Sequence, residues 1–293
     1  MQFPSTGIVG TGALALALGR ALQAKGVPIV AVASASRERA ERAARELGVA
    51  VQPVLVADLP RLARHILIAT ADGRIEAVAE ELASAELAGV VALHTCGAAG
   101  PAALVALRGA GVPVGVFHPL QTVVEGVSTE RVFDGVAFAI AGDRAARAWA
   151  EELAGRLAGR VLSIHDDAFA AYHAGAVLAS NGIAALIHGA VSLLGQGGVA
   201  PDAALSALAP LARAATDNVL RLGPAAALTG PVARGDAGTV ARHVAALGQS
   251  PPEIDALYRA VTRCLIRVAA ERQQAPEIRD ALTSALDARL KES

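Results

Sequence analysis

The chain has 293 residues, which is enough for two domains with separate hydrophobic cores. Its apolar share of 54% and charged share of 18% exclude a disordered protein, and the net charge of −1 gives no bulk attraction to nucleic acid or anionic lipid. The two cysteines, Cys96 and Cys264, form no pair motif, so the sequence predicts no metal site and favours a reducing, cytoplasmic location. The first ten residues carry no basic cluster, so we expect no signal peptide.

The first half of the chain alternates short β-rich runs with helical stretches. Strands are expected at 6–10, 28–33, 65–69, 89–94, 113–117, 136–141 and 160–164. Helices are expected at 13–25, 37–47, 73–83, 101–109 and 143–158. This alternation predicts an α/β fold, a doubly wound parallel sheet of the Rossmann type, in a domain of residues 1–165.

After residue 165 the strand signals stop. Helices are expected at 167–194, 202–221, 237–247, 252–272 and 276–290, separated by prolines and glycines. The sequence therefore predicts an all-α second domain at 166–293.

The stretch 168–201 contains no charged residue and is long enough to span a bilayer. It is interrupted by polar side chains and by Gly195, Gly197 and Gly198, and no basic cluster flanks it. We therefore expect this stretch to be buried in a core or a subunit interface, and we expect a homodimer formed through the second domain.

The first strand leads into a glycine-rich turn, Gly10-Thr11-Gly12-Ala13-Leu14-Ala15, ahead of a helix. This G-x-G-x-x-A pattern allows a tight turn, close approach of the backbone to a pyrophosphate, and close packing of helix on strand. The predicted cofactor-binding residues here are Gly10, Thr11, Gly12, Ala13 and Leu14. The alternative is an alanine-rich helix with a glycine-rich entry that binds nothing.

The end of the second strand indicates which dinucleotide binds. NAD sites usually place a carboxylate there, but this strand ends in Ser34-Ala35-Ser36-Arg37. Ser34, Ser36 and Arg37 offer hydroxyl and guanidinium donors to a 2′-phosphate, which favours NADPH. The alternative is that Ser36 only caps the next helix while the arginines are solvated.

Three further strand ends carry polar groups: Thr70-Ala71-Asp72, His94-Thr95-Cys96-Gly97 and a segment that begins at His118. Ligands of such sheets bind beyond the carboxyl ends of the strands. The cofactor-binding residues predicted here are Thr70, Ala71, His94, Thr95 and Cys96. Taken singly, each segment is equally well explained as loop structure, and no base for a Cys96 nucleophile is identifiable.

Polar residues also lie on the apolar helix that opens the second domain. On a continuous helix His173 and Ser180 are nearly eclipsed, and Asn181 lies beside Ser180. Downstream, Thr229 and Arg234 lie in a loop rich in glycine, where Arg234 suits a substrate carboxylate. Hydrogen bonds between helices, and a solvated arginine on a turn, are the alternatives.

These segments together resemble a known family. GIVGTGALALALG, HTCG, FHPLQT, YHAGAVLASN and LTGPVARGD are similar to NADP oxidoreductases that join a Rossmann domain to a C-terminal domain of formerly unknown function. Some members of that family are regarded as ketopantoate reductases. The broader resemblance is to 3-hydroxyisobutyrate and 6-phosphogluconate dehydrogenases and to pyrroline-5-carboxylate reductase.

The resemblance also shows one departure. In the hydroxyacid dehydrogenases a lysine precedes the asparagine by four residues, and aligned on Asn181 that position is Val177 here. We therefore assign protonation to His173 and polarisation to Asn181, with Ser180, Thr229 and Arg234 binding substrate.

Three functions follow from the residues and the resemblance. The first is NADPH-dependent reduction of a small 2-oxo acid, with 2-dehydropantoate (ketopantoate) as the best single substrate. The second is reduction of a cyclic imine acid, and the third is a non-catalytic NADP-binding sensor. No nucleic acid or membrane partner is expected.

Overall fold

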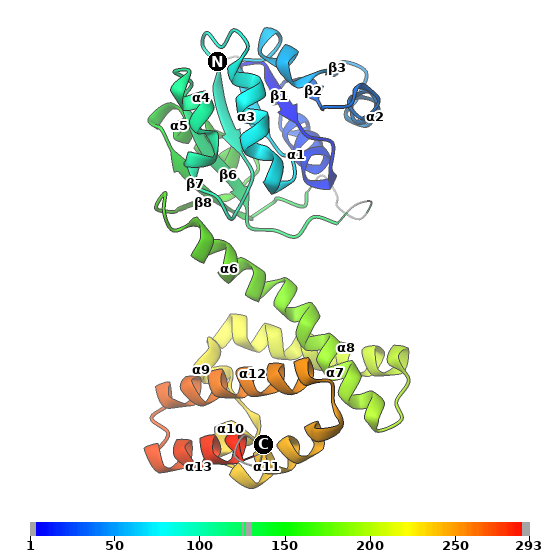
Figure 1. Ribbon diagram of the computed structural model, residues 1–293, viewed down its shortest axis with the longest axis vertical. Helices are drawn as coiled ribbons and strands as arrows, with labels where there is room; N and C mark the ends of the chain where they lie inside the picture. The colour runs from blue at the N-terminus through cyan, green and yellow to red at the C-terminus, as the bar shows by residue number, and fades with distance from the viewer. Residues whose placement is uncertain (1–3, 125, 127–130, 289–293) are drawn as a thin grey trace. The chain divides into compact units, whose positions relative to one another are not determined.

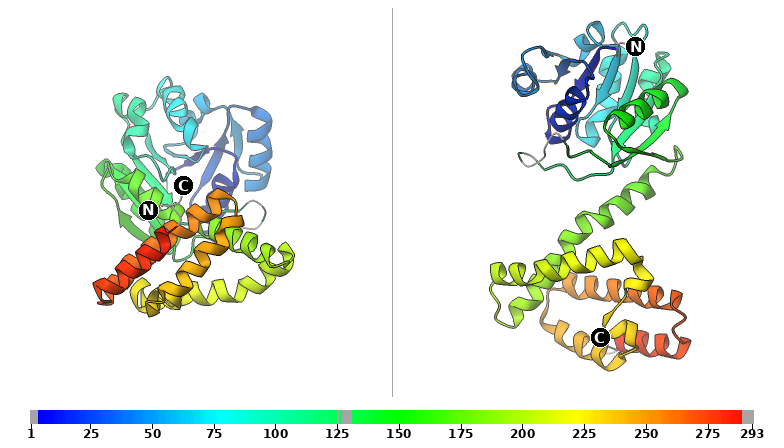
Figure 2. Two further views of the ribbon diagram at one scale, coloured as in Figure 1. Left: turned by 60° about the horizontal axis from the view of Figure 1, so that its bottom comes forward. Right: turned by 180° about the vertical axis from the view of Figure 1, so that it is seen from behind.

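The computed structural model describes residues 4–124, 126 and 131–288. Their contacts divide the chain into two compact units, with the division between Ser180 and Asn181 (Figures 1 and 2). The predicted domain boundary at residue 165 differs from this division, which groups the helix at 169–179 with the first unit.

The first unit is built on one eight-stranded sheet. Its strand order is β3-β2-β1-β4-β5-β6-β7-β8. The strands are β1 (Thr6–Val9), β2 (Ile29–Ala33), β3 (Gln52–Val54), β4 (His65–Ile68), β5 (Val91–His94), β6 (Val114–Pro119), β7 (Ala137–Gly142) and β8 (Arg160–Ser163). All pairs are parallel except β6 with β7. The order reverses between β1 and β4, which is the switch point where dinucleotides bind in doubly wound sheets.

Helices cover both faces of this sheet (Figure 1). One core joins the sheet to α1 (Ala13–Ala24), α2 (Arg37–Leu47) and α5 (Arg144–Arg156). The other joins it to η1 (Val56–Arg61), α3 (Ile75–Ala83), η3 (Pro101–Leu104) and α4 (Val105–Gly109). Because both faces are covered, the central strands are mostly apolar, as β2 (IVAVA) illustrates.

The predicted Rossmann-type sheet followed by helices is confirmed, with two local differences. The short strand β3 was not expected, because Gln52-Pro53-Val54 at the sheet edge carries little strand signal. The strand β7 runs antiparallel to β6, and the described residues between the two strands form no crossover helix.

The second unit is helical and is organised around one long helix. Its elements are α7 (Asn181–Gln196), α8 (Pro201–Leu222), α9 (Pro224–Ala227), α10 (Gly230–Arg234), α11 (Ala237–Ala246), η4 (Leu247–Gln249), α12 (Pro252–Glu271) and α13 (Pro276–Asp287). Helix α12 contacts α7, α9, α10 and α13. Its buried Arg259 pairs with Asp255 at 2.9 Å and donates to the Leu286 carbonyl, which ties α12 to α13. The short helix α10 replaces part of the loop expected around residue 230.

The prediction of a single helix at 167–194 is wrong in one respect, because the helix is interrupted at Ser180. Helix α6 (Phe169–Ala179) ends there and α7 begins at Asn181. Ser180 has φ −121° and ψ −79°, and its hydroxyl donates to the Ala176 carbonyl at 2.7 Å. Such bonding of a serine to the preceding turn bends helices. The eclipsed stripe expected for His173, Ser180 and Asn181 assumed a continuous helix, whereas in the structure one helix ends before Ser180 and the next begins after it.

Residues 169–196 are long and apolar enough to cross a membrane, and little of this stretch is buried within one chain. Core and interface helices of soluble proteins pass the same test.

Candidate active site

The glycine-rich turn after β1 has the shape that a dinucleotide requires. Gly10 has φ +130°, and a Cβ there would lie 2.2 Å from the Ala69 carbonyl oxygen, so only glycine fits. Gly12 begins α1, offers no side chain to cap it, and faces open space. The amides of the first turn of α1 are thus accessible to an anion. Thr11, Ala13 and Leu14 adjoin this turn and are partly buried.

At the end of β2, Ser36 does cap α2, because its hydroxyl accepts from the Arg39 N–H at 3.5 Å. The Ser36 N–H in turn donates to Ser34 Oγ at 3.4 Å. Arg37 pairs with Glu41 at 3.2 Å, yet its side chain is 76% exposed. Since surface pairs of this kind contribute little stability, Arg37 can turn toward a phosphate at small cost.

The loop after β5 is held by a buried histidine. His94 is fully buried; its Nδ1 accepts from the Cys96 N–H at 3.2 Å, and its Nε2 lies 3.1 Å from the Gly100 carbonyl oxygen. These contacts fix the neutral tautomer with hydrogen on Nε2, and burial lowers the pKa of His94 to about 4. The His94 side chain therefore shapes the loop, and the cofactor contact predicted for it would have to come from its backbone.

The other predicted residues of the loops after β4 and β5 differ in exposure. Thr95 is buried, with its hydroxyl 3.5 Å from the Ile68 carbonyl oxygen, and Ala71 is exposed at the start of η2 (Asp72–Arg74). The Thr70 hydroxyl is buried without a hydrogen-bond partner among the described residues. Burial raises the pKa of the Cys96 thiol, which keeps this sulfur protonated and argues against a nucleophile.

Helix α6 is attached to the sheet by its first residue. Phe169 is 1% exposed and packs on Val116 of β6 and on Ala139 and Ala141 of β7. A Cβ at Gly100 would lie 2.2 Å from the Asp166 carbonyl oxygen, so the loop after β5 lies directly against the chain that enters α6. This packing brings the next turn of α6 to the carboxyl ends of β5 and β6.

Three polar rings meet at this edge. The Tyr172 hydroxyl lies 2.8 Å from Nδ1 of His118, and the two rings are perpendicular. The rings of His118 and His173 lie 6.0 Å apart at 81°. Nδ1 of His173 is buried without a hydrogen-bond partner among the described residues, so one polar atom of the cluster is left for a ligand.

Gly97 marks the point on which the two histidines converge. A Cβ at this position would lie 2.6 Å from Nε2 of His118 and 2.7 Å from Nδ1 of His173. Both nitrogens therefore face the same small space above the Gly97 backbone. Two ring nitrogens in this arrangement can hydrogen-bond one substrate atom.

His118 and Tyr172 are neutral at physiological pH. Burial, and then the neighbouring His173, lowers the pKa of His118 to about 4. Burial raises the pKa of Tyr172 to about 12, so its hydroxyl keeps its proton. When Tyr172 donates to Nδ1 of His118, the hydrogen on Nε2 of His118 points toward the Gly97 space.

The predicted catalytic residues are divided between the two units. His173 joins the cluster of the first unit, whereas Asn181, Thr229 and Arg234 belong to the second unit. Ser180 ends α6 and bonds to Ala176, while Thr229 begins α10 and Arg234 is exposed at its end. No group of three or more His, Cys, Asp or Glu side chains is arranged to hold a metal within the part of the chain that the structure describes.

The sequence did not identify the His118–Tyr172 pair as a unit. His118 was visible as a polar strand end, and Tyr172 as the neighbour of His173, but 54 residues separate them. Phe169 is the residue that could have indicated this pairing. It is an apolar residue at the start of a helix, and the next turn of that helix carries Tyr172 and His173.

Acid should destabilise the first unit through His94 and His118. Each has a pKa of about 4 when folded and 6.5 when unfolded, so the unfolded chain binds more protons between these values. The stabilisation is complete above pH 6.5 and is lost as the pH falls toward 4, at up to about 1.4 kcal/mol per pH unit for each histidine. Denaturant unfolding followed by Trp149, the single tryptophan, measures this slope.

His118→Gln should reduce the slope of the unfolding free energy against pH by about the contribution of one histidine. His165→Gln, at an exposed position, should not change this slope. An equal slope in His118→Gln and in the unchanged chain would contradict the neutral state of His118.

Comparison with known proteins agrees with this geometry. Residues 5–95 match the family described as "NADP oxidoreductase coenzyme F420-dependent", and residues 136–265 match "Domain of unknown function (DUF2520)". None of the curated proteins matches the chain in sequence.

Solved structures share the fold over nearly the whole chain. A presumed NADP oxidoreductase from Bacteroides fragilis is 23% identical, with 90% of this chain and 98% of that chain covered and a TM-score of 0.71. A Thermotoga maritima protein is 22% identical, with coverage of 92% and 100% and the same TM-score. A reductive aminase from Aspergillus terreus, in complex with NADPH and ethyl-5-oxohexanoate, is 16% identical, with coverage of 99% and 95% and a TM-score of 0.58.

These structures establish the fold, and the family matches establish the class of protein. The resemblance inferred from the sequence is thereby confirmed. The chain joins an NADP oxidoreductase domain of the F420-dependent family to a C-terminal DUF2520 domain, and it is an NADP-dependent oxidoreductase.

Proposed function

We propose that this protein uses NADPH to reduce the carbonyl group of a small 2-oxo acid, with 2-dehydropantoate (ketopantoate) as the first substrate to test. The observation that carries the proposal is the convergence of His118 and His173 on the space above Gly97. NADPH, when bound, supplies the hydride.

The position of the cluster along the sheet supports this assignment. The accessible amides of α1 suit the pyrophosphate, and Ser34, Ser36 and Arg37 lie at the end of β2, on one side of the switch point. The other half of an extended dinucleotide then lies over the ends of β4, β5 and β6. Those ends carry Thr70, the loop of Thr95 to Gly97, and His118, so the reacting carbon would lie beside the histidine pair.

The polar groups of the cluster favour a carbonyl substrate over an imine. Hydride addition to a ketone leaves negative charge on oxygen, which needs nearby donors and then a proton. A neutral imidazole and a protonated tyrosine are such donors. Val177 occupies the position at which the hydroxyacid dehydrogenases have a lysine. We assign His173 as the proton donor to the substrate oxygen. The Tyr172–His118 pair would donate a hydrogen bond to the same oxygen.

Specific observations also bear on the two other functions. Reduction of an imine is supported by the shared fold with the reductive aminase and by the absent lysine, because an iminium ion arrives already protonated. A non-catalytic sensor would bind NADPH equally well but would not require the buried, unpartnered Nδ1 of His173.

Oxidation of NADPH with a panel of 2-oxo acids and a panel of cyclic imines separates the three functions. We expect turnover with the 2-oxo acids, and His173→Ala should lower kcat by about 10²- to 10⁴-fold because a positioned general acid is lost. NADPH affinity should not change in this variant, and His165→Ala serves as the matched control. Asn181→Ala tests the predicted polarising role in the same assay, with an expected loss of about 2–4 kcal/mol of transition-state stabilisation.

Turnover confined to the imine panel would contradict the choice of substrate, and binding of NADPH without any turnover would favour the sensor. Near-normal turnover in His173→Ala would exclude His173 as the proton donor.

Cofactor preference should depend on Arg37. A guanidinium that contacts a 2′-phosphate makes charge-assisted hydrogen bonds, so Arg37→Asp should weaken NADPH binding by about 1.5–3 kcal/mol and affect NADH less. Arg45→Asp, the same change of charge at the other end of α2, is the control. An unchanged preference in Arg37→Asp, measured by fluorescence titration of both cofactors, would remove Arg37 from the site.

We further propose a cytoplasmic homodimer. Leucines of α8 are unusually exposed in the single chain, with Leu211 at 66% and Leu220 at 79%, and Leu178 of α6 is 75% exposed. Apolar surface on this scale is typical of an interface with another protein chain. A second copy would cover it without a membrane.

Light scattering without detergent should therefore give twice the mass of one chain. The double change Leu211→Glu and Leu220→Glu should produce a monomer, since it would bury charge at the interface. Val105→Glu, at a residue of α4 that is 67% exposed, should leave the dimer intact. A stable monomer at micromolar concentration would contradict this proposal.

A further inference from the structure

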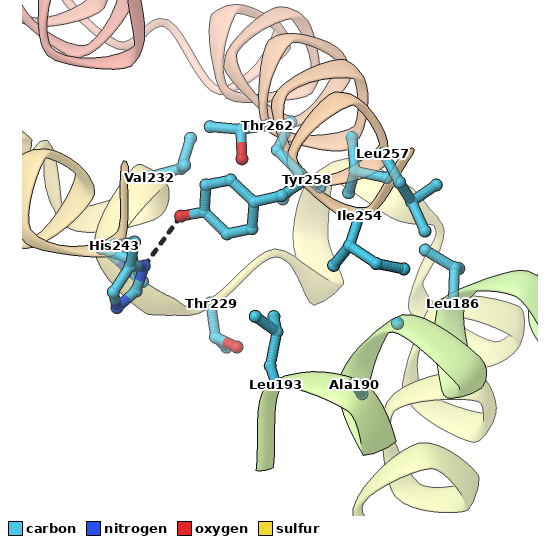
Figure 3. A pocket seen from close by; sticks show the side chains of 14 residues that line it. Leu186, Ala190, Leu193, Thr229, Val232, His243, Ile254, Leu257, Tyr258 and Thr262 are labelled. Carbon is cyan, nitrogen blue, oxygen red and sulfur yellow. Dashed lines mark hydrogen bonds between the residues drawn. The ribbon is translucent and has the colours of Figure 1, made fainter. Parts of the chain in front are cut away.

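A cavity of about 310 Å³ lies wholly within the second unit, between α7, α10, α11 and α12 (Figure 3). Aliphatic side chains form most of its wall. These are Leu186, Leu193, Ile254, Leu257, Val261 and Leu265. The cavity is partly open to the solvent. Its volume is at the lower end of the range for small-molecule sites.

The polar groups gather toward one end of this cavity. His243 and Tyr258 form a hydrogen bond of 2.7 Å between Nδ1 and the hydroxyl, and Thr229 lies nearby (Figure 3). Leu186, Ile254 and Leu257 line the other end. The cavity thus has the polarity of an amphipathic ligand, with an apolar body and one polar group.

Charge complementarity narrows the class of ligand. No Asp, Glu, Lys or Arg is among the described residues that line the cavity. Burial raises the pKa of Tyr258, which keeps its hydroxyl neutral. A charged ligand would lose its hydration without gaining an opposite charge, whereas a neutral hydroxyl or carbonyl needs only a hydrogen-bond partner.

The local fold holds the polar end in place. Asp236 caps α11, accepting from the Thr239 N–H at 2.9 Å and from the Thr239 hydroxyl at 2.6 Å, and this sets the helix that carries His243. Thr262, one turn after Tyr258 on α12, is 3% exposed and lies beside Tyr258. The orientation of the polar end is therefore fixed before any ligand binds.

We propose that this cavity is a binding site for a small, uncharged, mainly apolar molecule with a single hydroxyl or carbonyl group, which Thr229 and the His243–Tyr258 pair recognise. The site belongs to the second unit alone and does not depend on the reductase reaction proposed above.

The chain has only two tyrosines, Tyr172 and Tyr258, one in each unit. Full-length protein labelled with 3-fluorotyrosine therefore gives one fluorine resonance for each unit, assigned with Tyr172→Phe and Tyr258→Phe. The probes are p-cresol and toluene, which differ by one hydroxyl. Titration with p-cresol should shift the Tyr258 resonance in a saturable manner, with a dissociation constant on the order of millimolar for a ligand of this size.

Three variants test the location. Ala190→Leu places extra methyl groups into the cavity and should abolish the shift, whereas Ala256→Leu, on the opposite face of α12, should preserve it. Thr229→Val should weaken binding of p-cresol by roughly 2- to 12-fold, the effect of one hydrogen bond, and should leave toluene unaffected. Thermal unfolding of each variant establishes that it is folded.

Several outcomes would overturn the proposal. The first is a Tyr258 resonance that does not move up to the solubility limit of p-cresol. The second is a shift that persists in Ala190→Leu. The third is a Tyr258 resonance that depends on protein concentration rather than on the probe, because a second copy of the chain would then occupy the cavity. Failure of NADPH oxidation assays would leave these measurements unaffected.

Discussion

The packing of Phe169 on β6 and β7 is the contact on which the candidate active site depends. It anchors the start of α6 on the sheet, and this anchor brings Tyr172 and His173 to the carboxyl ends of the strands. A buried phenylalanine contributes about 3–5 kcal/mol, which offsets much of the cost of ordering the one helical turn that follows. The polar cluster is thus held by an apolar contact next to it, and its own hydrogen bonds remain available for chemistry.

The sheet and the cofactor loop were predictable because local signals carry them. The run TGIVG and the following glycine-rich turn specify a strand, a tight turn and a helix start within ten residues, and Gly10 has the positive φ that this turn requires. The break at Ser180 was not predictable, because the hydrogen bond of its side chain to Ala176 competes with a helix that the apolar pattern favours on both sides. The pairing of His118 with Tyr172 joins two distant segments, and no periodicity within either one encodes it.

The two helices that begin at the cofactor edge differ in how much of the N-terminus is left to bind a phosphate group. Helix α1 begins at Gly12, which has no side chain to cap the first amides, so these amides suit the fully charged pyrophosphate. Helix α2 begins at Ser36, whose hydroxyl already accepts from Arg39, so part of its N-terminus is satisfied internally. A phosphate there would depend more on a side chain, which is why the choice between NADPH and NADH should depend on Arg37 rather than on the helix itself.

A neutral His118 cannot stabilise an oxyanion in the way that a lysine does. A lysine ammonium in a partly buried site carries its charge in the resting enzyme and stabilises an oxyanion by that charge. Here burial lowers the pKa of His118 to about 4, so stabilisation of an oxyanion must come from oriented N–H donors instead. Such donors act only at short range and in fixed directions. The absence of a side chain at Gly97 is therefore as important as the presence of the histidines, because a Cβ there would lie 2.6 Å from Nε2 of His118 and 2.7 Å from Nδ1 of His173 and would displace both rings.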